Sequence, residues 1–443
     1  MIITENSPIA FNDPLPDKVD VVVIGGGVIG TSTAYFLTQK GFRVLLCDKG
    51  RIAGEQSSRN WGWIRQQGRD EAELPIVMDS LATWESLSAQ LDDDIGFSRQ
   101  GVLYTASNET ELAQFEEFMQ LAERYQLDTR LLSSNEVDKL VQDKPGQWVG
   151  GMFTPSDGRA EPFRAVPALA RLLKREGGVI REACAVRGVE LTAGRVSSVV
   201  TEHGSVAADA AVLAGGAWSS RFLGNLGVKL PQLTVRATVA RTAPAAQIFA
   251  GNAALDEVAI RRRQDGGYTI AATDINEHFV DLDSFRFFFK FLPALRSAVG
   301  FIRINIDRNS IAGLFEGRRW KMDEVSPFEL QRVLNPLPSR QAIRKMRKGL
   351  RKRAPQLALA EFVESWAGMI DVTPDVVPVM DQIPQHDGLF VATGFSGHGF
   401  GIGPGAGKVM AGMVAGETPN FDLGRFRYTR FFDGSPIVPG PGL

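Results

Sequence analysis

A glycine-rich turn near the N-terminus constrains the fold more than any other feature of this sequence. An apolar, β-branched run over 19–25 leads into the pattern G-x-G-x-x-G. The glycines of this pattern are Gly25, Gly27 and Gly30. A helical pattern follows over 28–40, and a second apolar run over 43–48 ends in Asp48. Strand, turn, helix, strand and acidic residue in this order predict a β-α-β unit that binds the pyrophosphate and ribose of a dinucleotide.

The chain is long enough for two domains. At 443 residues it exceeds the usual size of a single hydrophobic core. Alternating strand and helix patterns resume twice, and the stretches between them contain helices and hairpin signals such as the Asp-Gly-Gly at 265–267. We predict an α/β fold class: a Rossmann-like domain with a parallel sheet, interleaved with an α+β substrate domain on a mixed, largely antiparallel sheet. The expected segments are 18–95, 150–230 and 362–426 for the first domain, and 96–149 and 231–361 for the second.

Composition excludes several classes of protein. Apolar residues make up 44% of the chain, charged residues 23%, and the net charge is -2, so nucleic-acid binding is not expected. The two cysteines, Cys47 and Cys184, lie in apolar runs and give neither a disulfide framework nor a metal site. The first eighteen residues lack the pattern of a signal peptide, and no later window reaches the length of a membrane span. A cytoplasmic setting is therefore predicted.

Further motifs occur in a fixed order along the chain. They are "GEQSSRN" at 54–60, "VLAGGAWS" at 212–219, "WAG" at 366–368 followed by "TPD" at 373–375, and "GFSGHG" at 394–399. Together with the glycine turn, these motifs resemble the FAD-dependent amino-acid and amine oxidoreductases, which include D-amino acid, glycine and sarcosine oxidases. Longer stretches such as "VLAGGAWSSRFLGNLGVKLPQL" and "WKMDEVSPFE" are most similar to bacterial L-amino acid deaminases. Those deaminases carry a membrane-anchoring N-terminal segment that this sequence does not show.

The resemblance implies FAD in an extended form. It also implies that FAD is noncovalently bound, because neither cysteine stands at a flavin-linking position. Besides the glycines of the turn, the residues expected to bind FAD are Asp48, Lys49, Ser57, Ser58, Arg59, Asn60, Val186, Gly394, Gly397, His398 and Gly399. Of these, the glycine-rich stretch from 394 to 399 is expected to lie against the flavin ring, where a helix N-terminus favours negative charge. The helix that follows is expected from Lys408 to Gly416.

A histidine and several arginines are candidates for the chemistry. His398, one of four histidines, is expected near the flavin or the substrate, although a structural histidine in a glycine turn is the alternative. A substrate carboxylate favours a guanidinium, and the candidates are Arg65 and the three arginines at 261–263. Alternation places Arg262 on the opposite strand face from its two arginine neighbours. Any single arginine is more often a surface charge. Trp61 and Trp63 follow the flavin motif and are expected to line the pocket.

The cations that relatives place near the substrate are absent here. The corresponding positions carry Ile370, Gly401 and Thr273, so no relative's substrate can be copied onto this chain. The sequence predicts an FAD-dependent oxidoreductase that converts the C–N bond of an amino acid or secondary amine to an imine, which water hydrolyses. The first subclass is an amino acid dehydrogenase or deaminase. Alternatives are a sarcosine or dimethylglycine type N-dealkylating enzyme, and a flavin-bearing subunit of a multi-subunit amine dehydrogenase.

Two further stretches have competing interpretations. The stretch 340–353 is a basic amphipathic helix that could contact a membrane surface or an acidic protein, although it is more often the solvated face of a packed helix. The stretch 285–295 is rich in phenylalanine and could form an aromatic surface or roof the substrate cavity.

Overall fold

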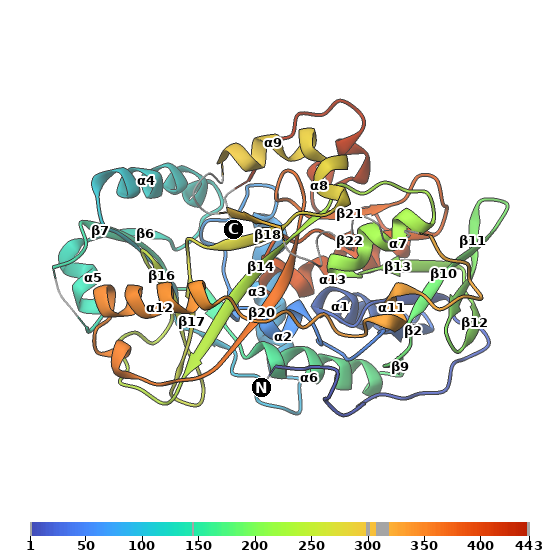
Figure 1. Ribbon diagram of the computed structural model, residues 1–443, viewed down its shortest axis with the longest axis horizontal. Helices are drawn as coiled ribbons and strands as arrows, with labels where there is room; N and C mark the ends of the chain where they lie inside the picture. Colours follow the sequence, from blue (N-terminus) through green and yellow to red (C-terminus); the bar gives the residue numbers. More distant parts are fainter. Residues whose placement is uncertain (1, 144–145, 298–301, 307–318, 441–443) are drawn as a thin grey trace.

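Two sheets organise the molecule (Figure 1). The computed structural model describes residues 2–143, 146–297, 302–306 and 319–440. The first sheet has the order β21-β22-β13-β1-β2-β9 and is parallel except for β21. Its strands are β1 (Val21–Ile24), β2 (Val44–Cys47), β9 (Val179–Arg181), β13 (Ala210–Leu213), β21 (Val379–Gln382) and β22 (Leu389–Thr393). The first two strands flank a helix and form the predicted β-α-β unit.

Alternation along β1 supplies both faces of this sheet. Val21 and Val23 join a core under helices, whereas Val22 and Ile24 join a second core on the other face. The helices of the first core are α1 (Val28–Gln39), α3 (Leu74–Ser88), α6 (Pro162–Arg175) and α13 (Gly399–Val414). The second core is covered by β10 (Val186–Thr192), β11 (Arg195–Thr201), β12 (Gly204–Ala207) and α7 (Ser219–Asn225).

The second sheet is mixed and mainly antiparallel, as predicted. Its order is β19-β18-β14-β17-β16-β15-β5-β7-β6, with β20 paired to β14. The strands are β5 (Val102–Ala106), β6 (Arg130–Ser133), β7 (Gly150–Thr154), β14 (Leu233–Thr242), β15 (Asn252–Leu255), β16 (Val258–Arg262), β17 (Tyr268–Ala272), β18 (Asn276–Phe279), β19 (Ile302–Asn305) and β20 (Phe362–Val372). The helices α5 (Ser134–Leu140) and α12 (Arg340–Arg353) share its core, and α4 (Glu109–Arg124) lies nearby.

The sheets divide the chain differently from the expected segments at two strands. Both β7 and β20 were expected in the dinucleotide-binding domain, but both pair in the second sheet. The strand β20 pairs with β14 along its whole length, from Val372 opposite Leu233 to Phe362 opposite Thr242. Alternation in a strand identifies a buried face but not the partner strand, so the sequence could not assign β20 to a sheet.

The remaining described elements are short. They are α2 (Gln56–Arg59), β3 (Trp63–Ile64), β4 (Ser98–Arg99), β8 (Gly158–Arg159), α8 (Leu282–Arg286), α9 (Phe288–Ser297), α11 (Pro327–Leu330), and the 3-10 turns η1 (Gly216–Trp218), η2 (Leu357–Leu359), η3 (Gly424–Phe426) and η4 (Tyr428–Phe431). Three of them, β3, β8 and β4, pair as a small separate sheet. Within the described ranges, no helix combines the length and the apolar composition that crossing a bilayer requires.

The glycine-rich stretch near the C-terminus is helical, whereas the sequence predicts a turn with the helix beginning at Lys408. The helix α13 begins at Gly399. Its glycines bring it against its neighbours: a Cβ on Gly405 would lie 2.5 Å from the Ile76 carbonyl oxygen of α3, and one on Gly407 would lie 2.5 Å from Ser32 Cβ of α1. Close helix packing therefore explains these glycines better than turn formation.

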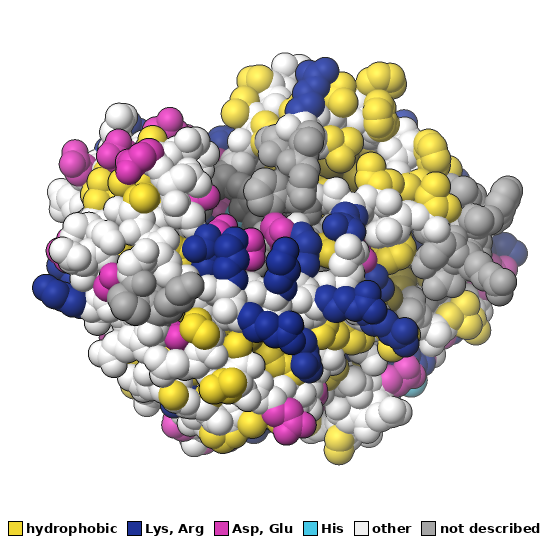
Figure 2. Space-filling view, turned by 60° about the vertical axis from the view of Figure 1, so that its left-hand side comes forward, with side chains coloured by type: hydrophobic (Ala, Val, Ile, Leu, Met, Phe, Trp, Pro, Cys, Tyr) yellow, Lys and Arg dark blue, Asp and Glu magenta, His cyan; other side chains and the backbone are white. Residues whose placement is uncertain are grey.

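The phenylalanine-rich and basic stretches lie on the surface. Phe287 and Phe291 pack against Val235, whereas Phe289 is 85% exposed, and within the described residues none of these phenylalanines lines the main cavity. Lys and Arg side chains gather across the face shown in Figure 2. On α12, Lys352 pairs with Glu257 at 2.6 Å, and Lys345 and Arg353 also pair with acidic residues of this chain. A membrane or protein contact through 340–353 stays a prediction.

Candidate functional site

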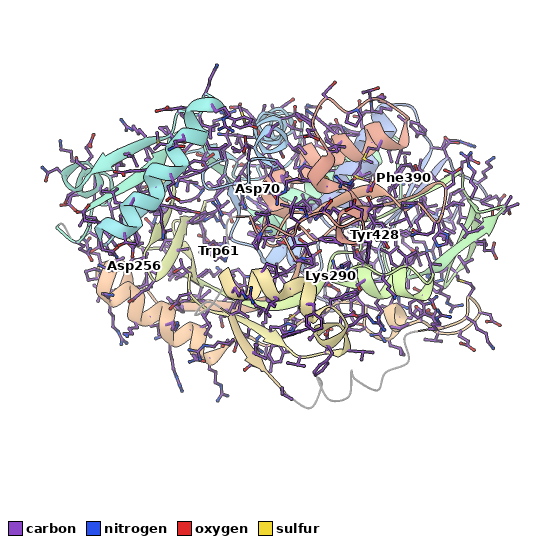
Figure 3. The ribbon with its side chains drawn as sticks, turned by 90° about the horizontal axis from the view of Figure 1, so that it is seen from above. Trp61, Asp70, Asp256, Lys290, Phe390 and Tyr428 are labelled. Atoms are coloured by element: carbon purple, nitrogen blue, oxygen red, sulfur yellow. The ribbon has the colours of Figure 1, made fainter. Side chains whose placement is uncertain are left out.

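One cavity extends from the parallel sheet to the second sheet. At one end it is lined by Gly25, Gly27 and Asp48, and at the other by Val239 of β14 and Ile370 of β20. Trp61, which also lines the cavity, lies between the two lobes of the molecule (Figure 3). The arrangement follows from the topology, because the carboxyl ends of parallel strands open toward the second sheet.

The glycine turn leaves the N-terminus of α1 open to the cavity. Gly27 is the N-cap of α1 and makes no side-chain capping hydrogen bond. The Val28 N–H donates to Ser57 Oγ at 2.9 Å. Gly25 has a φ of +111°, and a Cβ there would lie 2.4 Å from the Ala214 carbonyl oxygen. Ser57 accepts from one N–H of this helix end, and the helix end and the side-chain-free turn still form a site suited to a phosphate group.

Asp48 closes this end of the cavity. Its carboxylate accepts hydrogen bonds from the N–H groups of Gly26 at 2.8 Å and Gly50 at 2.7 Å. Burial raises the pKa of Asp48 to about 6. Lys49 pairs with Glu55 at 2.7 Å, and Val186 at the start of β10 lines the same end. Asp48, Lys49 and Val186, which the sequence analysis expects to bind FAD, thus line the same cavity.

The segment after the glycine turn has both lining and supporting residues. Ser57, Arg59 and Asn60 line the cavity, whereas Ser58 does not. The Arg59 guanidinium is committed elsewhere: it donates to the carbonyl oxygens of Gly54 at 3.1 Å and Ala367 at 2.9 Å. The structure therefore gives Arg59 a role in joining α2 to β20.

The N-terminus of α13 forms the opposite wall. Gly397, His398 and Gly399 line the cavity, and Gly394 lies behind them. The Gly394 N–H donates to Asp371 at 2.6 Å. His398 is the N-cap of α13 and caps it with no side-chain hydrogen bond, so a second helix N-terminus opens onto the same cavity. The stretch 394–399, which the sequence analysis expects against the flavin ring, thus reaches the cavity at the N-terminus of α13, whereas the glycine turn reaches it at the N-terminus of α1.

His398 is held by a glutamate that the sequence analysis did not identify. Its Nδ1 lies 3.1 Å from Glu73 Oε2, and both side chains are buried. Burial, followed by the charge of Arg69, lowers the pKa of His398 to about 4. Burial opposes ionisation of Glu73, but His398 and the nearby arginines outweigh it and lower the Glu73 pKa. At neutral pH a neutral imidazole therefore donates from Nδ1 to an ionised Glu73, and Nε2 has no partner among the described residues.

The predicted arginines separate into two places. Arg65 lines the cavity, donates to the Gln67 carbonyl oxygen at 2.5 Å and lies over the Tyr104 ring. Arg262 does not line the cavity; it donates to the Ala245 carbonyl oxygen at 3.0 Å. The structure thus gives Arg262 no position from which to bind a substrate there.

The neighbours of Arg262 are also used within the protein. The buried Arg261 donates to Glu161 Oε2 at 2.9 Å, and Arg263 lies 3.7 Å from the same oxygen. Neither arginine lines the main cavity.

Arg69 also lines the cavity and was not identified from the sequence. Arg69 is 6% exposed, and its Nη1 has no hydrogen-bond partner in the described part of the chain. Burial, followed by the charge of Arg65, lowers the pKa of Arg69 to about 9. In the sequence, Arg65, Arg69 and Glu73 are spaced four residues apart. This spacing alone does not distinguish a functional cluster from an ordinary polar loop.

Aromatic side chains complete the second-sheet end. Trp61 and Trp63 meet edge to face with ring centroids 5.4 Å apart, and both line the cavity, as the sequence predicts. Thr273 and Ile370 also line it. This end combines an apolar wall with Arg65 and Arg69.

Comparison with known proteins identifies related sequences. Residues 20–413 match the profile of the family described as FAD dependent oxidoreductase. Mitochondrial sarcosine dehydrogenase of Mus musculus is 24% identical over 433 residues, covering 95% of this chain and 42% of the dehydrogenase. Glycine oxidase of Geobacillus kaustophilus is 24% identical over 427 residues, covering 93% of this chain and 97% of the oxidase. The chain spans less than half the length of the sarcosine dehydrogenases that it matches.

Solved structures give a closer likeness. L-amino acid deaminase from Proteus myxofaciens, solved in complex with anthranilate, has a TM-score of 0.92 at 29% identity and covers 97% of this chain and 100% of that chain. L-amino acid deaminase from Proteus vulgaris has a TM-score of 0.90 at 26% identity, covering 96% of this chain and 100% of that chain.

Proposed function

Because the chain belongs to the family of FAD-dependent oxidoreductases, we propose that it oxidises the C–N bond of an amino acid or secondary amine to an imine. Water then hydrolyses the imine to a keto acid or aldehyde and releases ammonia or an amine. One observation carries this proposal: the cavity that holds the open N-terminus of α1 continues past the N-terminus of α13 to a wall of arginines and tryptophans. A cofactor and a small charged substrate can therefore share it.

The residues present fit FAD. The glycine turn would hold the pyrophosphate, and Asp48 retains lone pairs for ribose hydroxyls beyond its two backbone hydrogen bonds. The uncapped N-terminus of α13 would favour the negative charge of a reduced flavin. When bound, FAD supplies the acceptor for the hydride that leaves the substrate carbon. The two cysteines, Cys47 and Cys184, line the adenosine end, which supports noncovalent binding of the flavin ring elsewhere.

The chain's own residues bind and orient the substrate. Trp61 and Trp63 provide an apolar wall for a side chain or N-alkyl group, and Arg65 provides positive charge for a carboxylate. His398 is neutral at pH 7 and Glu73 fixes its tautomer, so Nε2 can accept a hydrogen bond from the substrate nitrogen once the ammonium group has lost a proton to water. Removal of that proton leaves the neutral amine from which oxidation proceeds.

The first subclass we propose is an amino acid dehydrogenase or deaminase. It is supported by the likeness to the Proteus L-amino acid deaminases over nearly the whole chain. An N-dealkylating enzyme of the sarcosine or dimethylglycine type is the second candidate, supported by the matches to sarcosine dehydrogenase. A flavin-bearing subunit of a larger complex and a cytoplasmic setting stay predictions.

Anaerobic mixing of the purified protein with a panel of amines tests the proposal. Amino acids or N-methyl amino acids are expected to bleach the flavin absorbance, and the product identifies the bond: a keto acid with ammonia indicates deamination, and formaldehyde indicates N-demethylation. A flavin that NADH reduces and no amine reduces would contradict C–N oxidation. The same panel repeated with added oxygen or a quinone identifies the electron acceptor.

A further inference from the structure

The further inference concerns Arg69, a buried cation at the substrate end of the cavity. Among the described residues, no carboxylate oxygen lies within ion-pairing distance of its guanidinium, whereas most other buried arginines here have such a partner, for example Arg261 with Glu161 and Arg430 with Asp375. A buried guanidinium without a counter-ion is costly, because it loses hydration and gains no compensating charge.

The acids around Arg69 are already engaged. Glu73 accepts from His398 at 3.1 Å. Asp157 accepts from the N–H of Gln66 at 2.7 Å and of Gln67 at 3.2 Å. Asp70, adjacent to Arg69 in the chain, pairs with Arg425 at 2.8 Å. The positive charge of Arg65, which lines the same cavity, adds repulsion.

The turn that carries Arg69 is built to hold it in place. Gly68 has a φ of +67°, and the Arg69 N–H donates to the Gln66 carbonyl oxygen at 3.2 Å. Asp157 fixes the same turn through the two backbone N–H groups of Gln66 and Gln67. A fixed backbone keeps the guanidinium at the cavity, and its Nη1 is a buried donor without a partner.

We propose that Arg69 binds the carboxylate of the substrate, so that the enzyme acts on amino acids or N-alkyl amino acids and discriminates against amines that lack a carboxylate. The inference rests on the proposed function for the position of the substrate. A planar carboxylate matches the donor fork of a guanidinium and supplies the missing counter-ion. Arg65, whose Nη1 is already bound to a backbone carbonyl, adds long-range positive charge.

Benzoate is the probe, because it carries a carboxylate and no oxidisable amine, and benzamide is the neutral control of the same shape. Binding to the holoenzyme is measured through the perturbation of the flavin absorbance spectrum. Wild type is expected to bind benzoate and to bind benzamide weakly. Arg69→Gln is expected to raise the dissociation constant of benzoate at least about tenfold and to change that of benzamide by less than about twofold.

Two further variants keep the test decisive. Arg195→Gln removes an exposed arginine from β11 and is expected to leave benzoate binding unchanged. If Arg69→Gln does not retain flavin, Arg69→Lys is measured in its place. Lysine keeps the positive charge but lacks the paired donors of a guanidinium, so this variant is expected to bind benzoate more weakly than wild type. Wild-type benzoate affinity in the measured Arg69 variant, or no benzoate binding by wild type, would overturn the proposal.

The benzoate measurement and the amine panel test different claims, and either can fail without the other. If amines fail to reduce the flavin while benzoate still depends on Arg69, the oxidation is wrong and the carboxylate site stands. If amino acids reduce the flavin while Arg69→Gln binds benzoate as wild type does, the anchor is wrong and the oxidation stands. In wild type, an amino acid is expected to reduce the flavin at far lower concentration than its decarboxylated amine, and Arg69→Gln is expected to narrow this difference.

Discussion

At the scale of single residues, Gly27 shows how the absence of a side chain creates a binding site. Its φ of -74° suits any residue, so its role is spatial rather than conformational. A Cβ there would lie 3.1 Å from Ser57 Oγ, at the open end of α1. The backbone at this point can approach a phosphate only while no methyl group stands between them.

Gly27→Ala is therefore expected to fold and to bind FAD at least about tenfold more weakly, because the methyl group occupies the phosphate position. The measurement is titration of flavin-free protein with FAD, followed by quenching of flavin fluorescence. Gly224→Ala is the control, since a Cβ there meets no atom within 4 Å. Equal FAD affinity in Gly27→Ala and wild type would show that the pyrophosphate does not lie at this turn.

His398 links the site to pH. Its pKa is about 4 in the folded protein and near 6.5 in the unfolded chain, so the unfolded chain binds more protons between these values and stability falls as the pH drops from about 6.5 to about 4. His398→Gln removes this contribution. We expect the free energy of unfolding, from urea denaturation, to decline less steeply in His398→Gln than in wild type, by up to about 1.4 kcal/mol per pH unit.

The exposed Ser205 provides the control for this measurement, because its substitution removes no titratable group. Ser205→Ala is expected to follow the wild-type pH dependence. Parallel pH curves for His398→Gln and wild type would mean that the imidazole titrates normally and is not held neutral beside Glu73.

The sequence alone identified some of the residues that line the cavity. Gly27, Asp48 and His398 lie in the cavity wall because each belongs to a motif whose geometry is local. Arg262 does not line the cavity. The alternation of side chains along a strand separates its two faces but does not show which face meets the cavity. Arg69 was missed because a buried cation in a loop is defined by distant neighbours, here on α13 and in the 150–160 segment, which no local pattern reveals.

At the scale of elements, α13 shows why a glycine run need not be a turn. The sequence predicted the open helix end near His398 but began the helix at Lys408, because glycines weaken helices in isolation. Packing against α1 and α3 overrides that preference, since only a residue without a Cβ allows the helices to approach so closely.

Two glycines of α13 therefore predict opposite effects. Gly405→Ala would place its Cβ 2.5 Å from the Ile76 carbonyl oxygen and is expected to lower the free energy of unfolding by about 1–3 kcal/mol. Gly412→Ala meets only the flexible Glu417 side chain and is expected to raise it by up to about 1 kcal/mol. Urea denaturation measures both, and destabilisation of similar size in both variants would argue that helix packing does not explain the glycines.

At the scale of the whole molecule, the cavity belongs to both sheets. The paired strands β14 and β20 cross between the lobes in Figure 1, and Trp366 of β20 donates from Nε1 to the Arg59 carbonyl oxygen at 2.9 Å. The sequence predicted both sheets and their interleaving, because turn and strand patterns are local. The assignment of β7 and β20 depended on long-range pairing and could not be predicted.

A ligand that contacts both lobes should stabilise both. FAD at one hundred times its dissociation constant is expected to add about 2.7 kcal/mol to the stability of the flavin-free protein, and so to raise its Tm. Far-UV circular dichroism and tryptophan fluorescence are expected to report the same shift. NAD at equal concentration is the control and is expected to shift neither. A shift confined to one of two separate transitions would show that FAD contacts only one lobe.

The central claim is that FAD lies in the cavity between the N-termini of α1 and α13. The most direct test is the visible absorbance spectrum of the purified full chain, followed by heat denaturation and analysis of the supernatant. The account predicts a yellow protein with flavin absorbance and release of equimolar FAD into solution, since the cofactor is noncovalent. A colourless protein that takes up no FAD on reconstitution would contradict it.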